Sequence, residues 1–252
     1  MSRAPGQKAR SWRQRFVAGV YATHNRSAQV QKTLRRCLTD MGPGSRGLEV
    51  GAGSSRLHAA LVTLDLVPGP TIDVCATAEC LPFSDGVFDV VVSQEVLEHV
   101  RDPFRAMQEM RRVLKPGGLI YCQVPFVIGY HPGPTDFWRF TREGIRELIE
   151  QAGLRCHQIN IAVGPGTGFY RIAVEFLAVL VSRFAESMYL PAKGVFALFL
   201  YPLKWLDSVL SKSPQADRIP GGYLIIAGRQ LEVRDARGPI ADSGREVNLE
   251  TR

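Results

Sequence analysis

The amino-acid sequence predicts an α/β fold built on a parallel sheet, and two observations support this prediction. Between Leu48 and Gln123, short apolar runs alternate with segments of helical periodicity, which is the pattern of βαβ units. The first apolar run opens into a glycine turn, Gly51-Ala52-Gly53, as strands do where α/β sheets bind nucleotides. At 252 residues, 45% hydrophobic and 22% charged, the chain can bury the core of one large domain.

Apolar runs of strand length recur along the chain. In order they cover residues 47–50, 62–66, a weak run at 71–75, then 87–93, 119–126, 156–163 and 222–229.

Three helices are predicted between these strands. A short one spans Ser55–Leu61. The second follows Asp102, which can cap it, has Pro103 at its first position, and ends at the sequence Lys-Pro-Gly-Gly of 115–118. The third begins at Thr141 and runs to Ala152, where Gly153 ends it.

The domain organisation follows from these elements. We predict a basic N-terminal helical arm (1–40), a main domain (41–230) and a charged flexible tail (231–252). A helical lid or insert occupies 164–221 within the main domain. Its two apolar segments, 171–190 and 194–210, both contain charged residues or proline, so neither offers the roughly 20 apolar residues of a membrane-spanning helix.

The formal charge of +7 is unevenly distributed. Residues 1–39 carry nine basic and no acidic side chains, whereas the rest carries 22 basic and 24 acidic ones. This arm could meet the phosphates of an anionic membrane surface, with nucleic acid less favoured, or it could be a solvated helix without a partner. The arm lacks the apolar stretch of a secretory signal, so a cytoplasmic location, with peripheral attachment to the inner membrane face as an option, is expected.

The five cysteines form no C-x-x-C pair, and no histidine is spaced to complete a zinc site with them. We therefore expect reduced thiols and no metal site.

The glycine turn does not fit a dinucleotide. In the pattern G-x-G-x-x-G, Arg56 occupies the position of the third glycine. Glu49, just before the turn, would repel a phosphate and suits a ligand with a positive group. Asp65 ends the second strand, where α/β nucleotide sites place an acid on the ribose hydroxyls. A nicotinamide-dependent oxidoreductase is therefore the weaker alternative.

Several segments together resemble the class I S-adenosylmethionine (SAM)-dependent methyltransferases of the type 11 group. The matching segments are EVGAGS (49–54), LDL (64–66), TAECLPFSDGVFDVVVSQEVLEHV (77–100), DPFRAMQEMRRVLKPGG (102–118) and LIYCQVPF (119–126). The segment 131–154 is similar to a subset of this group. The resemblance implies a Rossmann-like, mostly parallel seven-stranded sheet with helices on both faces, to which the apolar segments of 164–221 add a hydrophobic helical insert before the last strand. It also implies SAM as cofactor and methyl transfer, without identifying the acceptor, for which we expect a small-molecule or lipid-like compound.

The resemblance also implies the cofactor-binding residues. They are Glu49, Gly51, Ala52 and Gly53 around the methionine half, Asp65 at the ribose, Thr77, Ala78 and Glu79 beside adenine, and Ser93, Gln94 and Glu95 under the methionine moiety. Two positions depart from the family pattern: Ser55 replaces its third glycine, and Thr77 stands where an acid is frequent. These departures leave open a methyltransferase-like module with weakened catalysis.

Three residues are candidates for catalysis: His99, His131 and Asp136. Methyl transfer is mainly a matter of alignment, and a general base is optional. Each candidate has a structural alternative. His99 can tie down its loop, and Asp136 can pair with Arg139 while Phe137, Trp138 and Phe140 pack into the core.

The insert carries more apolar surface than a cover over a small polar substrate requires. Three explanations remain open: packing on its own domain, a homodimer interface, or contact with a membrane or lipid-like substrate. The basic arm favours the last of these.

Overall fold

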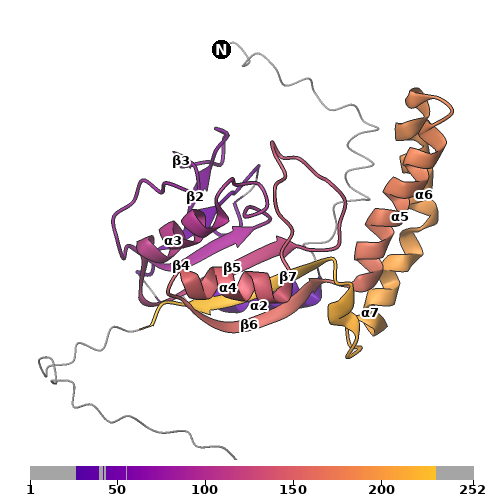
Figure 1. The fold of residues 1–252 in the computed structure, drawn as a ribbon. Helices are drawn as coiled ribbons and strands as arrows, with labels where there is room; N and C mark the ends of the chain where they lie inside the picture. The colour runs from indigo at the N-terminus through magenta and orange to yellow at the C-terminus, as the bar shows by residue number, and fades with distance from the viewer. Residues whose placement is uncertain (1–26, 40–41, 43, 55, 231–252) are drawn as a thin grey trace, which may run out of the picture.

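The computed structural model describes residues 27–39, 42, 44–54 and 56–230. Figure 1 shows a central sheet with helices on both faces and a pair of helices that extends away from one end of it. Most of the predicted arm and the whole of the predicted tail, 231–252, lie outside the described residues.

Seven strands form one sheet in the order β3-β2-β1-β4-β5-β7-β6. They are β1 (Gly47–Val50), β2 (Leu61–Asp65), β3 (Val74–Cys75), β4 (Phe88–Gln94), β5 (Leu114–Pro125), β6 (Arg155–Val163) and β7 (Gly222–Gly228). All neighbours are parallel except at β7, which is antiparallel to both β5 and β6. The mostly parallel seven-stranded sheet is therefore confirmed. The strand order reverses between β1 and β4, which is where open α/β sheets bind ligands.

Helices cover both faces of the sheet (Figure 1). On one face, α3 (Pro103–Val113) and α4 (Arg142–Gln151) pack in the main core, with Met107, Met110 and Ile149 fully buried. On the other face, α2 (Ala28–Thr39) buries Val30 and Leu34. Alternate residues of the strands serve the two cores, as the pleat requires. Because α2 packs on the sheet, residues 28–39 of the predicted arm belong to the domain itself.

The helix starts agree with the sequence predictions. Asp102 caps α3 by accepting a hydrogen bond from the Arg105 backbone N–H at 2.9 Å, and Pro103 is its first residue. Thr141 caps α4 in the same way, through the Gly144 N–H at 3.1 Å. Both caps satisfy backbone donors that a helix start leaves unpaired.

The short helix predicted over Ser55–Leu61 is wrong, because the described residues between β1 and β2 form turns. Side chains take the backbone groups that a helix would use: Glu49 accepts from the Leu57 N–H, and Arg56 donates to the Leu61 carbonyl. Gly51 and Gly53 adopt left-handed φ angles, and β2 already begins at Leu61. Few residues are therefore left between the turn and the strand to form a helix.

The insert forms a helical hairpin between β6 and β7. Its helices are α5 (Pro165–Ser182), α6 (Tyr189–Phe199) and α7 (Asp207–Leu210), with short 3-10 turns η2 (Glu186–Met188), η3 (Tyr201–Leu206) and η4 (Ala216–Arg218). The two long helices lie side by side and project from the sheet (Figure 1). Among the described residues, no helix combines the length and apolar character needed to cross a membrane.

α5 begins earlier than the predicted segment at 171. The Asp207 carboxylate explains this, because it accepts hydrogen bonds from the Gly166 and Thr167 N–H groups at 2.7 and 3.1 Å. Between the long helices, Tyr170 is fully buried and donates to the Ala197 carbonyl at 3.0 Å. The hairpin therefore has a small core of its own.

Candidate active site

The glycine turn after β1 is held against β2. The backbone N–H groups of Gly51 and Ala52 both donate to the Leu64 carbonyl, at 2.8 and 3.1 Å. Gly51 and Gly53 have φ angles of +73° and +62°, in the left-handed region that favours glycine. A Cβ atom at Gly51 would overlap the Val96 side chain. The turn therefore requires glycine here for both conformation and space.

Asp65 fastens this turn at the end of β2. One of its carboxylate oxygens accepts from the Gly53 N–H at 2.8 Å, and the other from the Val67 N–H at 2.9 Å. The carboxylate of Asp65 thus stands beside the glycine turn, as the predicted ribose role requires.

Arg56 stands at the position of the third dinucleotide glycine, and its guanidinium is bound to neighbouring segments of the protein. Its guanidinium donates to the Asp73 carboxylate at 2.6 Å. Glu49 is buried, and burial raises its pKa, while its carboxylate accepts from the Leu57 N–H at 3.0 Å. Glu49 thus stabilises the segment that follows the glycine turn. Its contact with the methionine half of the cofactor stays a prediction.

The loop after β3 connects the pocket to the start of α3. The Thr77 hydroxyl donates to Glu79 Oε2 at 3.2 Å, and Glu79 Oε1 accepts from the Asp102 N–H at 2.8 Å. Thr77 and Glu79 therefore act as a unit at the position where the family pattern frequently has one acid.

The end of β4 carries Ser93, Gln94 and Glu95, which are predicted to lie under the methionine moiety. Gln94 donates through its side chain to the Gln123 side-chain oxygen at 3.0 Å, and Ser93 is fully buried. Glu95 follows with a φ angle of +56°, which is uncommon for a residue with a side chain. Such strained positions persist where the surrounding structure holds them, and they cluster at functional sites.

These segments surround a cavity of about 340 Å³ at the carboxyl ends of β1, β2 and β4. The volume lies within the roughly 300–1,000 Å³ of ligand pockets. Of the predicted cofactor residues, the cavity is lined by Gly51, Asp65, Thr77, Ala78, Glu79 and Glu95. The other predicted ones, Glu49, Ala52, Gly53, Ser93 and Gln94, are not among the lining residues. Residues of two further segments complete the lining: Val96, His99, Val100 and Arg101 after β4, and Pro134, Thr135 and Phe137 before α4.

The chemistry of the lining fits SAM better than a dinucleotide. Three carboxylates line the cavity, Asp65, Glu79 and Glu95, against one guanidinium, Arg101. Carboxylates favour the ammonium and sulfonium of SAM and disfavour a pyrophosphate. Gly51 keeps the turn packed closely against Val96, which also lines the cavity.

Beside this cavity lies a polar cluster that the sequence only partly anticipated. Glu98 is 0% exposed, and its Oε1 lies 3.5 Å from His99 Nε2 and 3.4 Å from His131 Nε2. Burial raises the pKa of Glu98 to about 8, and it lowers that of His131. The imidazole rings of His99 and His131 meet edge to face, with centroids 5.2 Å apart.

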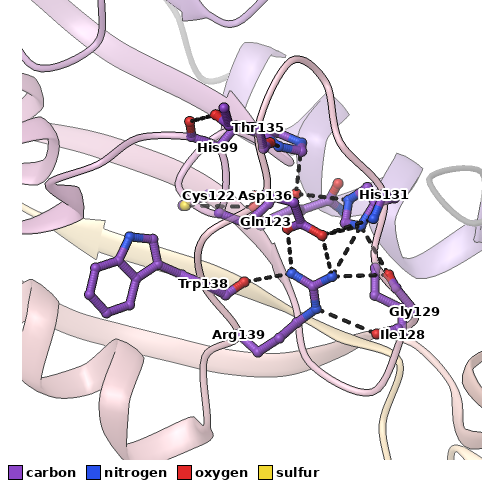
Figure 2. A network of polar contacts seen from close by, with 11 residues as sticks. His99, Cys122, Gln123, Ile128, Gly129, His131, Thr135, Asp136, Trp138 and Arg139 are labelled. Atoms are coloured by element: carbon purple, nitrogen blue, oxygen red, sulfur yellow. Dashed lines mark hydrogen bonds and ion pairs between the residues drawn. The ribbon is translucent and has the colours of Figure 1, made fainter.

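The predicted residues His131 and Asp136 are brought together by one loop. Asp136 accepts from the His131 backbone N–H at 2.8 Å, and both carboxylate oxygens bind the guanidinium of Arg139 (Figure 2). This ion pair lowers the pKa of Asp136 to about 2. The geometry favours the structural alternative for Asp136, since its carboxylate is already engaged and a poor proton acceptor.

The same loop is bound to the segment after β4. The Phe137 N–H donates to the Glu98 carbonyl at 2.7 Å, and Thr135 Oγ1 donates to the His99 carbonyl at 3.0 Å. Only part of the predicted aromatic packing forms, because Phe140 is buried whereas Phe137 and Trp138 are exposed. Trp138 instead donates its indole N–H to the Val100 carbonyl at 3.0 Å.

Sequence reasoning missed Glu98 as a site residue. Its neighbour His99 was singled out, but nothing in the sequence says that a glutamate directly after a turn is fully buried. The available signal was position: Glu98 follows the carboxyl end of a strand, where parallel sheets place their sites.

Comparisons with known proteins agree with this picture. A family model described as "Methyltransferase domain" matches residues 48–122. Ubiquinone biosynthesis O-methyltransferase of Cereibacter sphaeroides (strain ATCC 17029) is 32% identical over 172 residues, which cover 53% of this chain and 69% of the relative. An uncharacterized methyltransferase of Mycobacterium sp. (strain KMS) is 35% identical over 111 residues, 37% of this chain and 44% of the relative.

A solved structure shares the fold. Phosphoethanolamine N-methyltransferase 2 of Haemonchus contortus, in complex with S-adenosyl-L-methionine, superimposes with a TM-score of 0.51. The match is 16% identical and covers 86% of this chain and 56% of that one.

Proposed function

This chain belongs to the class I SAM-dependent methyltransferases, and on that premise we propose that it methylates a lipid-like acceptor at a membrane surface. SAM, when bound, supplies an activated methyl group. The main observation in favour of a lipid-like acceptor is the apolar outer surface of the hairpin formed by α5 and α6.

The residues that would hold the cofactor are the glycine turn at 51–53, Asp65 and the Thr77–Glu79 loop. Glu95 and His99 line the same cavity from the end of β4, beside the loop 131–140. In the proposal, the acceptor enters between these two segments. Their mutual hydrogen bonds hold the entrance in one shape, which is what alignment of a nucleophile requires.

Large apolar side chains cover the outside of the hairpin. The exposed ones are Phe169, Ile172, Phe176, Val179, Leu180, Phe184, Met188, Leu190, Val195, Leu198, Phe199, Trp205, Leu206, Val209 and Leu210. The inner faces of α5 and α6 are already used, since they pack on each other around Tyr170. A helix pair that is apolar inside and outside needs a cover from elsewhere.

Three charged groups on the long helices and η3 have partners within the hairpin. The Glu175 carboxylate pairs with the Lys193 ammonium and accepts from the Tyr189 hydroxyl at 2.6 Å. The Lys204 ammonium lies over the rings of Tyr170 and Tyr201, 5.2 Å from each centroid. These contacts hold the Glu175, Lys193 and Lys204 charges against the hairpin, while Arg183 and Glu186 are exposed at the turn between the long helices. Apolar helix faces with charges at their ends suit contact with a lipid surface.

A bilayer surface suits this hairpin better than a second copy of the chain. A dimer would cover one side, whereas exposed apolar residues occur on both long helices. The nine basic residues of 1–39 add attraction to anionic lipid, about 1 kcal/mol for each one near the surface. The curated relatives named Ubiquinone biosynthesis O-methyltransferase support an oxygen atom as the methyl acceptor.

Vesicle co-sedimentation tests the membrane part of the proposal. We expect the full chain to pellet with vesicles that contain anionic phosphatidylglycerol at low salt. The double variant Phe184→Ser/Phe199→Ser should bind more weakly by about tenfold or more, because each large apolar side chain contributes about 1.5–3 kcal/mol on burial. Phe184 and Phe199 are 85% and 77% exposed, so these changes spare the core.

Ile219→Ser is the matched control, since Ile219 is exposed but lies outside the two long helices. It should pellet like the wild type. If the wild type remains in the supernatant with anionic vesicles at low salt, the membrane proposal fails, and size-exclusion chromatography would then examine the hairpin as a dimer interface.

A separate assay tests the acceptor class. Radiolabelled SAM is supplied with a hydroxylated aromatic ring, either carrying an isoprenoid tail in vesicles or without a tail in solution. Faster labelling of the tailed compound supports the proposal, and equal labelling of both contradicts it.

A further inference from the structure

The Glu98, His99 and His131 side chains converge beside the cofactor cavity. Their candidate ligand atoms, one carboxylate oxygen and two imidazole nitrogens, all lie within 4.8 Å of one another. We propose that these three side chains bind one divalent transition-metal ion. The spacing of cysteines and histidines in the sequence predicts no metal site. His131 is far from His99 in the chain, and only the folded loop 131–140 brings it there.

The distances within the cluster match shared coordination. Both Nε2 atoms face the same oxygen, Glu98 Oε1, at 3.5 Å from His99 and 3.4 Å from His131. Bonds of about 2.0–2.2 Å to a metal at tetrahedral angles place neighbouring ligand atoms about 3.4 Å apart. Two of the three distances therefore fit an ion at the centre of the cluster, and the two imidazole nitrogens, which lie within 4.8 Å of each other, complete the set.

The cluster is unsatisfied as it stands. Glu98 is fully buried, and among the described residues neither of its carboxylate oxygens has a hydrogen-bond partner. His131 Nε2 is also buried without a hydrogen-bond partner in this part of the chain. Buried polar atoms are normally paired, because leaving them unpaired costs free energy. A cation bound between them satisfies all three atoms at once.

The His99 imidazole is oriented as metal ligands are. His99 Nδ1 lies 2.5 Å from the Thr135 carbonyl oxygen, so the proton belongs on Nδ1 and the Nε2 lone pair faces Glu98. His131 Nδ1 lies 3.3 Å from the Gly129 carbonyl oxygen, 3.5 Å from the Asp136 carboxylate and 3.3 Å from Arg139 Nη2. Metal-binding histidines donate their other N–H group to such carbonyls or carboxylates, which fixes the ring.

The surrounding charges permit a cation. Glu95 acts electrostatically on Glu98 and adds a second negative charge, while Asp136 and Arg139 neutralise each other as a bidentate pair. Arg171 and Arg139 are cations that act on His131. With Glu98 ionised, as a metal ligand must be, the carboxylates of Glu95, Glu98 and Asp136 outnumber these two cations by one.

Two imidazoles and one carboxylate select a borderline metal. Zn²⁺, Fe²⁺, Co²⁺ and Mn²⁺ accept this set, whereas Ca²⁺ and Mg²⁺ prefer oxygen ligands alone. Three protein ligands leave open positions, and His99 itself lines the cavity. Such positions can bind water or an oxygen atom of the acceptor. The metal proposal does not depend on the acceptor being lipid-like.

Metal titration of the full chain tests this proposal. The protein is prepared without a histidine tag, stripped with a chelator, and titrated with Zn²⁺ and Co²⁺ by calorimetry, with the visible absorption of Co²⁺ as a second readout. We expect one equivalent to bind. His99→Ala and His131→Ala should each weaken binding by at least about tenfold, as loss of even an outer partner does.

Controls separate the site from adventitious binding. His58→Ala and His157→Ala change exposed histidines outside the cluster, and both should bind metal like the wild type. Glu98→Gln keeps the side-chain shape and should also weaken binding. If Glu98→Gln does not fold, the two histidine variants decide, because their side chains are partly exposed.

Two outcomes would overturn the site: no stoichiometric binding by the wild type, or equal losses in the control variants. SAM titration of every variant runs in parallel without metal. Retained SAM binding shows that a variant is folded, and it separates failure of the metal site from failure of the methyltransferase assignment.

Discussion

Arg139 and Asp136 form a bidentate ion pair in which Nη1 donates to Oδ1 at 2.6 Å and Nη2 donates to Oδ2 at 2.7 Å. The Asp136 side chain is 1% exposed, and the same guanidinium also donates to the Gly129 carbonyl at 2.9 Å. Figure 2 shows the pair in the middle of the loop network, between His131 and Trp138. Its position gives it control over the shape of the loop 131–140.

Arg139→Ala should therefore destabilise the fold. The change leaves the buried Asp136 carboxylate without its cation, which typically costs about 3–5 kcal/mol. Urea unfolding measures the loss. Arg142→Ala is the control, since Arg142 pairs with the exposed Asp217 and should cost less, about 1 kcal/mol. Equal losses in the two variants would show that the loop pair has no special role.

Asp65→Ala should weaken SAM binding without unfolding the protein. The Asp65 carboxylate lines the cavity and is the candidate acceptor for the ribose hydroxyls. Removing hydrogen bonds to a charged group costs about 1.5–3 kcal/mol, which corresponds to roughly a tenfold to hundredfold rise in Kd. Isothermal titration with SAM measures it. Asp217→Ala, at an exposed carboxylate far from the cavity lining, should leave Kd unchanged.

Gly51→Ala should abolish SAM binding for two separable reasons. The φ angle of +73° disfavours any side chain, and the new methyl group would overlap Val96. In the double variant Gly51→Ala/Val96→Ala the overlap is relieved but the backbone strain remains. We expect partial recovery of binding in the double variant. Full binding by the single variant would contradict the close approach inferred for the turn.

Glu109→Gln should lower the free energy of unfolding at pH 7 and should also make that free energy change less as the pH falls. Glu109 is buried, accepts from the Arg112 guanidinium at 2.8 Å and from the Leu81 N–H at 2.9 Å, and the hydrogen bond from Arg112 is the main cause that lowers its pKa. A carboxylate with a depressed folded-state pKa stabilises the fold above its unfolded pKa of about 4.3, and this contribution is lost as the pH falls through the folded value.

Unfolding experiments at pH 7 and below pH 4 measure this linkage. The wild type should lose stability between these values, and the variant should lose less because glutamine does not titrate. Glu147→Gln, at an exposed position of α4, is the control and should behave like the wild type. Parallel acid profiles for wild type and Glu109→Gln would contradict the assignment.

The sheet could be predicted because its signals are local. Apolar runs, the Asp102 and Thr141 caps and the glycine turn each depend on a few neighbouring residues, and the structure confirms them. The helix expected over 55–61 failed for a non-local reason. Glu49 and Arg56 reach across to backbone groups of neighbouring segments and stabilise turns there.

The site was predictable in position more than in detail. Strand ends locate the cavity, so Asp65, Thr77 and Glu95 were found from pattern and resemblance. The burial of Glu98 and its approach to His131 depend on how the loop 131–140 folds over the strand ends. Hydrogen bonds such as that from Phe137 N–H to the Glu98 carbonyl set this approach, and no periodicity in the sequence encodes them.

The junction between β6 and β7 has an evolutionary consequence. Val163 and Gly222 are register partners, and the Gly221 N–H donates to the Val163 carbonyl at 2.8 Å, so residues 164–221 leave and re-enter the sheet at neighbouring points. The excursion can lengthen, shrink or be exchanged between lineages while the strand pairing stays intact. The insert can therefore be replaced at this junction without a change in the strands that build the cofactor cavity.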